Sequence, residues 1–170
     1  MEPPAAWKPP ADLRPGERVL VSACLLGERT RWDGASNPAA GLVEALEAAG
    51  AVVVPVCPEM LGGLPAPRPP AEPPAGDGRE VLAGRQPVLT VGEGGGADVS
   101  AAFRAGARAA LALAREHRAR YAWLQERSPS CGVERTHSGG GVIDGPGVTT
   151  ALLRDEGRLT VFPADGTRRS

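Results

Sequence analysis

The sequence of 170 residues predicts a single-domain α/β protein with a Rossmann-like, three-layer fold and a short, mostly parallel sheet of about four strands. Two observations support this fold class. Short runs rich in β-branched and aromatic residues alternate with amphipathic stretches at helical spacing, and this order implies parallel strands joined by right-handed crossovers. The length suits one hydrophobic core and is short for two.

Four short runs are typical of buried strands, and three amphipathic stretches between them are typical of helices. The strands are expected at 18–22, 51–56, 121–124 and 159–162. The helices are expected at 41–49, about 98–118 and 147–154. Gly50 suits the C-cap of the first helix, and Asp98 suits the N-cap of the second.

Proline and glycine mark the segments outside this core, and both are abundant, with 18 and 23 residues. Residues 1–16 are expected as a proline-rich leader, either mobile or lying along the domain. The α/β domain then spans 17–164, and 165–170 form a C-terminal tail. The proline-rich stretch 62–78 is too long for a simple connector, so we expect it to form a wall of the functional site.

The charge balance indicates a small-molecule partner. Lys and Arg number 19, Asp and Glu number 20, and the net charge is −1, so no overall field favours a nucleic acid. No apolar run reaches the roughly 20 residues that span a bilayer, and no signal pattern opens the chain. We expect a cytoplasmic protein, and nothing in the sequence indicates its oligomeric state.

Three cysteines stand just beyond three of the predicted strands. Cys24 and Cys57 follow the first two strands, and Cys131 follows the third within Ser-Pro-Ser-Cys-Gly. Loops after parallel strands emerge at one carboxyl edge, where ligands usually bind. The three thiols are therefore expected to meet in one crevice. Structural disulfides are a poor explanation, because the number of cysteines is odd and a reducing compartment disfavours them.

The residues alone leave several chemistries open for these thiols. A single cysteine is often just a small buried hydrophobic residue, but burial does not explain three at three strand ends. A zinc site would need a fourth ligand, for which His137 is a candidate. A thiol hydrolase would need one cysteine with a base. An iron–sulfur cluster uses all three thiolates, either in a catalytic site or in a non-catalytic sensing module.

Polar residues beside the cysteines supply the candidate catalytic groups. Glu59 closely follows Cys57, and a carboxylate in a partly desolvated crevice suits a base that activates water. Ser128 and Ser130 flank Cys131 closely enough to hydrogen-bond a cluster sulfide or a substrate carbonyl.

Four further residues are candidates for substrate binding. Ser22 flanks Cys24 in the same way as the other serines flank Cys131. The guanidinium groups of Arg31 and Arg68 suit planar oxygens or an anionic group. Trp32 can stack on a pyrimidine ring.

Three ordered blocks of the chain resemble the signature of the thiouracil desulfurase family, long catalogued as a domain of unknown function. They are 22–27 with 31–34, 56–59 with 62–64 and 67–72, and 128–132. The resemblance extends over about residues 18–162. Two positions depart from the family pattern, because Trp32 stands where tyrosine is common and Gln125 where lysine often precedes the serine block.

The resemblance implies an enzyme with an oxygen-sensitive 4Fe-4S cluster held by Cys24, Cys57 and Cys131. It also implies that the iron without a cysteine takes the sulfur of a thiolated pyrimidine, and that water attacks the ring carbon. Thiouracil would become uracil without net redox change. The missing lysine at Gln125 removes a charge near this site, which leaves the preferred thiolated base open.

Overall fold

The computed structural model describes residues 8–164, and positions 1–7 and 165–170 lie outside the described residues. A four-stranded sheet with all neighbouring strands parallel forms its centre. In spatial order the strands are β2 (Val52–Val56), β1 (Arg18–Ser22), β5 (Tyr121–Gln125) and β8 (Thr160–Ala164). The predicted fold class is confirmed, and each strand lies within two residues of its predicted bounds.

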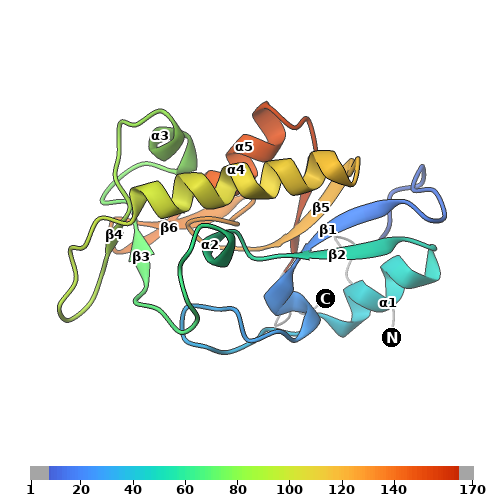
Figure 1. The fold of residues 1–170 in the computed structure, drawn as a ribbon, viewed down its shortest axis with the longest axis horizontal. Helices are drawn as coiled ribbons and strands as arrows, with labels where there is room; N and C mark the ends of the chain where they lie inside the picture. The colour runs from blue at the N-terminus through green and yellow to red at the C-terminus, as the bar shows by residue number, and fades with distance from the viewer. Residues whose placement is uncertain (1–7, 165–170) are drawn as a thin grey trace.

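Helices cover both faces of this sheet (Figure 1). The long α4 (Ser100–Glu116) and α5 (Val148–Asp155) pack on one face, and α1 (Ala40–Ala48) packs on the other. Neighbouring residues of a strand point to opposite faces. Accordingly, Leu20 belongs to the core under α4 and α5, whereas Val19 and Val21 belong to the core under α1.

Each edge strand carries a proline at a position where a backbone N–H would point away from the sheet. The amide of Val52 donates to Glu17 O at 2.8 Å, so amides two and four positions later also face β1, and Pro55 faces outward. Thr160 N donates to the carbonyl of the residue before β5 at 2.9 Å, so Pro163 faces outward by the same alternation. Neither proline therefore removes a hydrogen bond between the strands, and both discourage pairing with the edge of another sheet.

Several short elements have no counterpart in the sequence pattern. They are the 3-10 turn η2 (Ala23–Leu26), α2 (Pro58–Leu61), α3 (Gly78–Leu82), the antiparallel pair β3 (Ala71–Glu72) and β4 (Leu89–Thr90), and the hairpin β6 (Arg135–Ser138) and β7 (Gly141–Asp144). The stretch 62–78, expected to be irregular throughout, therefore contains β3. None of the helices within residues 8–164 has the length and hydrophobicity to cross a membrane.

The described part of the predicted leader, residues 8–16, lies along the body of the domain. Gly16 N donates to Gly50 O at 2.8 Å. The Arg120 guanidinium bonds Asp12 at 2.9 Å and Glu17 at 2.7 Å, which ties the leader to the start of β5. Positions 1–7 of the leader and the predicted tail at 165–170 fall outside the described residues.

Direct backbone contact joins α2 to α4 and thereby fixes the end of β2. A Cβ placed on Gly106 would lie 2.0 Å from Pro58 O, and one on Gly62 would lie 2.1 Å from Ala102 O. Only glycine permits such an approach. Because α2 begins at Pro58, immediately after Cys57, this contact sets where the Cys57 side chain emerges.

We predict that Gly106→Ala lowers the free energy of unfolding by about 1–3 kcal/mol, because the added Cβ must displace the backbone of α2. Helix propensity alone predicts the opposite sign, a gain of about 1 kcal/mol. Urea denaturation of both proteins measures the difference. Ala105→Gly, at the adjacent exposed position, calibrates the propensity effect. A more stable Gly106→Ala variant would contradict the packing described above.

Candidate functional site

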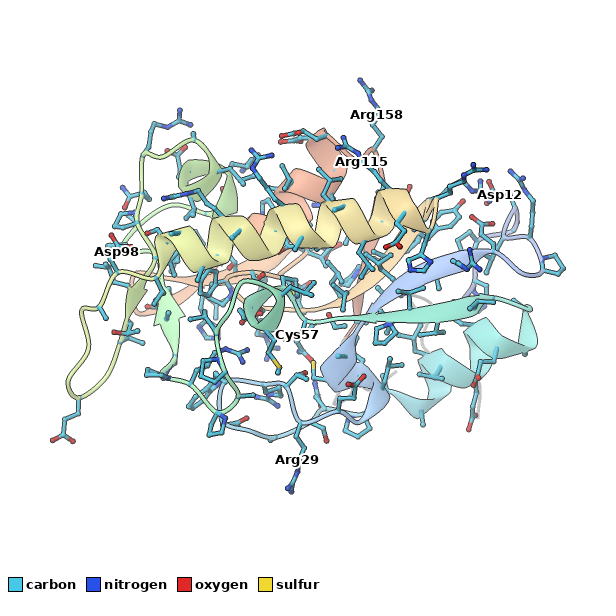
Figure 2. All side chains as sticks on the ribbon, in the orientation of Figure 1. Asp12, Arg29, Cys57, Asp98, Arg115 and Arg158 are labelled. Atoms are coloured by element: carbon cyan, nitrogen blue, oxygen red, sulfur yellow. The ribbon has the colours of Figure 1, made fainter. Side chains whose placement is uncertain are left out.

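The three cysteines line one cavity at the carboxyl edge of the sheet. Cys24 lies in η2 directly after β1, Cys57 lies between β2 and α2, and Cys131 lies in the loop after β5. The cavity has a volume of about 480 Å³, within the usual range for small-molecule sites. Figure 2 shows Cys57 just beneath α2, at the end of β2.

The order of the strands explains why this cavity forms here. From β1 the chain first adds β2 on one side and later adds β5 on the other. The crossovers on the two sides of β1 therefore diverge, and a crevice opens outside its carboxyl end, as is usual at such a reversal. The segments after all three strands border this crevice, in agreement with the expected meeting of the thiols.

All three thiols are free and disfavour the charged form. Burial raises the pKa of Cys24 to about 12, and it raises the pKa of Cys131 well above its ordinary value. Burial and then the nearby Glu59 carboxylate raise the pKa of Cys57. Such thiols are poor nucleophiles, because nucleophilic cysteines have lowered pKa values. Coordination by a metal reverses this preference, since a coordinating thiol is deprotonated outright.

The spacing of the ligating groups does not suit a single metal ion. Within residues 8–164, no three side chains of His, Cys, Asp or Glu are arranged to hold one ion together. A zinc ion needs its ligands about 2.0–2.3 Å away, whereas a four-iron cluster is larger and binds thiolates that stand further apart.

Gln125, which ends β5, connects the surroundings of Cys24 and Cys131. Its Oε1 accepts hydrogen bonds from Asn37 Nδ2 at 2.8 Å and from Cys24 Sγ at 3.6 Å. Its backbone N–H donates to Ser22 Oγ at 2.9 Å, and Ser22 also hydrogen-bonds the Cys131 thiol. Ser22 lines the cavity but is almost fully buried between these partners.

The two serines before Cys131 have different surroundings. Ser128 lines the cavity, and its Oγ accepts from the amides of Ser130 at 3.1 Å and Cys131 at 3.0 Å. Since its oxygen accepts both bonds, its O–H remains available as a donor. Ser130 is fully buried and shares a 2.8 Å hydrogen bond with the Thr149 hydroxyl behind the cavity lining. Ser130 therefore supports the loop from behind.

Glu59 and Arg68 form an ion pair inside the cavity. Arg68 Nη2 lies 3.1 Å from Glu59 Oε2, and only 6% and 14% of the respective side chains are exposed. A second nitrogen, Nη1, donates to Pro65 O at 3.1 Å. Much of the guanidinium expected to bind substrate is thus committed to the protein. The proline-rich stretch contributes Pro65, Pro69 and Pro70 to the lining, as expected of a wall.

Arg31 and Trp32 lie at the rim of the same cavity. Arg31 Nε is 3.9 Å from Asp33 Oδ1, a loose and half-exposed pair that leaves most of its donors available. Trp32 is 47% exposed, and its carbonyl accepts from Arg68 N at 2.7 Å. His137, on β6, also lines the cavity from an exposed position.

Some residues around the cavity were not among the sequence candidates. They are Asn37, Glu126, Thr149 and Thr150. A weak signal was present for Glu126, because a polar residue directly after a buried strand faces the edge where ligands bind. The threonines gave no signal, since they lie within the last predicted helix and contact the Cys131 loop only in the folded protein.

Comparison with known proteins agrees with the resemblance. The model of the 2-thiouracil desulfurase family matches residues 19–164. The Bacillus subtilis (strain 168) protein named uncharacterized protein YbbK is 39% identical over 142 residues, which cover 82% of this chain and 91% of the relative. The solved structure of the [4Fe-4S]-dependent thiouracil desulfidase TudS is similar with a TM-score of 0.72 and 44% identity, covering 86% of this chain and 90% of the other. The chain thus belongs to the 2-thiouracil desulfurase family.

Proposed function

We propose that this protein is an iron–sulfur-dependent desulfurase that converts a thiolated pyrimidine, such as thiouracil, to the corresponding carbonyl base. Overall, the thiobase and water give the oxo base and hydrogen sulfide, so no redox partner is needed. The observation that carries the proposal is the convergence of three cysteines from three strands on one cavity beside Glu59. Family membership supports the same chemistry.

A 4Fe-4S cluster fits the donor set of this cavity, with Cys24, Cys57 and Cys131 as its ligands. Thiolates are the usual ligands of such clusters, and the sequence has three cysteines and no fourth. When bound, the cluster would supply a Lewis-acidic iron, left open by the missing fourth cysteine, for the thiocarbonyl sulfur. Ser22, which hydrogen-bonds Cys131, would tune the sulfur of that ligand.

Glu59 is the group that we assign to water activation. Its carboxylate lines the cavity and is held by Arg68 at 3.1 Å, which keeps one oxygen fixed and leaves the other available. A positioned carboxylate can accept a proton from water as the water attacks the ring carbon. The ion pair with Arg68 fixes the orientation of this carboxylate in the cavity.

The remaining candidates divide between substrate binding and support. Arg31 and Trp32, at the rim, would bind the polar edge and the face of the pyrimidine ring. The Ser128 hydroxyl would donate to a substrate carbonyl, while the buried Ser130 holds the loop through Thr149. The proposed partner is a small thiolated nucleobase, and a reducing cytoplasm would keep the three thiols free.

We predict that Cys24→Ser, Cys57→Ser and Cys131→Ser each abolish cluster formation, because hydroxyl groups replace thiolate ligands poorly. Protein purified without oxygen is reconstituted with iron and sulfide, and iron, sulfide and visible absorption are measured per chain. Sulfide release from 2-thiouracil and 4-thiouracil then measures turnover. If two cysteines were dispensable for activity, a thiol hydrolase would replace the proposal. A complete cluster without turnover of either thiobase would favour a sensing role.

Glu59→Gln keeps the shape of the side chain but removes the base. We expect normal iron and sulfide content and a decrease in kcat of about 10²–10⁴-fold. Anaerobic sulfide-release assays on the reconstituted protein measure it. Glu93→Gln, in an exposed loop, is the matched control and should retain wild-type kcat. A Glu59→Gln variant with full activity would remove Glu59 from the mechanism.

Arg68→Met should destabilise the protein by about 3 kcal/mol, because it leaves the Glu59 carboxylate buried without its partner. The double variant Arg68→Met with Glu59→Gln should recover part of this loss, since no unpaired charge remains. Urea denaturation of the four proteins in this cycle measures the coupling. Additive effects would show that the ion pair does not stabilise the fold, and would return Arg68 to a role in substrate binding.

A further inference from the structure

The carboxylate of Glu126, the first residue after β5, is surrounded by backbone amides. Its Oε1 accepts from Val133 N at 2.7 Å, from Glu134 N and Arg135 N at 3.1 Å each, and from Arg127 N at 3.3 Å. Its Oε2 accepts from Glu134 N at 3.3 Å. Hydrogen bonds from amides to a carboxylate are charge-assisted and strong, and several amides converging on one anion form a nest.

These amides come from both ends of one loop, residues 127–135. Arg127 starts the loop with a left-handed backbone, φ 68°, which is strained for a residue other than glycine. Arg135 ends it, and Arg135 O accepts from Arg127 N at 3.1 Å. Glu126 itself is fixed to the sheet, because its N–H donates to Ala164 O of β8 at 3.0 Å. The carboxylate therefore closes the loop against the end of the sheet.

The loop that Glu126 closes carries Ser128 and Cys131. On its other side the start of α5 holds it, with Val148 N donating to Pro129 O at 2.9 Å and Thr150 Oγ1 donating to Cys131 O at 3.0 Å. Hydrogen bonds therefore hold the loop on two sides, from α5 and from the Glu126 carboxylate. Without that carboxylate, the loop would lose the hydrogen bonds from the amides of Val133, Glu134 and Arg135.

Glu126 is poorly placed to act on a substrate directly. It borders the cavity, but the backbone amides occupy its carboxylate, and Oε1 alone receives four of them. Any effect of this side chain on the chemistry must therefore pass through the position of the loop. The same amides balance its negative charge beside a site lined by three cysteines.

We propose that Glu126 is a positioning residue that holds Cys131 and Ser128 where the cluster and the substrate require them. The proposal rests on the desulfurase function proposed above. Residues that orient metal ligands typically contribute 10–100-fold to metal affinity or activity, which sets the size of the effect expected here.

Two variants and one control test the proposal. Glu126→Ala removes all the carboxylate bonds, and we expect cluster affinity and kcat to fall about 10–100-fold. Glu126→Gln retains an oxygen at the position of Oε1, where four amides converge. It replaces Oε2 with an NH2 group, which cannot accept the long hydrogen bond from Glu134 N. It should stay within about threefold of the wild type, a change smaller than the 10–100-fold loss expected for Glu126→Ala. Glu134→Ala removes an exposed carboxylate from the same loop and should match the wild type.

The first readout does not depend on the cluster or on activity. Hydrogen exchange of the cluster-free protein should show faster exchange at Val133, Glu134 and Arg135 in Glu126→Ala than in the control. Iron and sulfide retained against a chelator, together with the midpoint potential of the reconstituted cluster, form the second readout. Assays with 2-thiouracil give kcat and KM as the third, and we expect the loss in kcat.

Several results would overturn the proposal. Unchanged exchange, cluster retention and potential in Glu126→Ala would show that the loop does not depend on the carboxylate. A loss in Glu126→Gln equal to that in Glu126→Ala would show that charge, and not the geometry of the loop, is what matters. If Glu126→Ala does not fold, Glu126→Asp replaces it in all three readouts, because the shorter side chain withdraws the carboxylate from the amides of Val133, Glu134 and Arg135. If the wild type binds a cluster but turns over no thiobase, the proposed function fails, and exchange and cluster retention still judge the role of Glu126.

Discussion

The parallel pairing of β1 with both β2 and β5 is the constraint on which the cavity depends. Because these strands run in one direction, the segments that follow them emerge at one edge. The register between β1 and β2, which pairs Ser22 with Val56, brings the start of η2 beside the end of β2. Cys24 and Cys57 are therefore neighbours in the fold although the sequence separates them widely. The loop after β5 brings the third thiol, Cys131, to the same cavity from the other side of β1.

Direct backbone contacts hold two of the three segments that carry the thiols. The contact of Gly106 with Pro58 places α2 behind Cys57. A Cβ on Gly147 would lie 2.5 Å from Ser130 O, so the start of α5 touches the Cys131 loop in the same direct way. Close-packed backbones leave little freedom for small shifts. Such rigidity suits a site whose ligands must meet one rigid inorganic group.

Charge compensation around the cavity follows from the same close packing. Thiols without a metal are kept neutral by burial and by the Glu59 carboxylate. Two acidic residues that line the cavity are each balanced, Glu59 by Arg68 and Glu126 by backbone amides. This division explains why Arg68, which the sequence suggested for substrate, lies against a carboxylate. It leaves Arg31 as the more available guanidinium at the rim.

The sequence alone was sufficient for the four central strands, the longer helices, the family and the edge at which the cysteines gather. The strands and helices could be predicted because their apolar residues recur at a regular spacing over many positions. Elements such as β3 and β4, with two residues each, are too short to show any period. The partners of Ser130, Glu59 and Glu126 were decided only by the tertiary structure. Hydrogen bonds and ion pairs depend on which groups the folded chain brings within about 3 Å, and no local pattern encodes that distance.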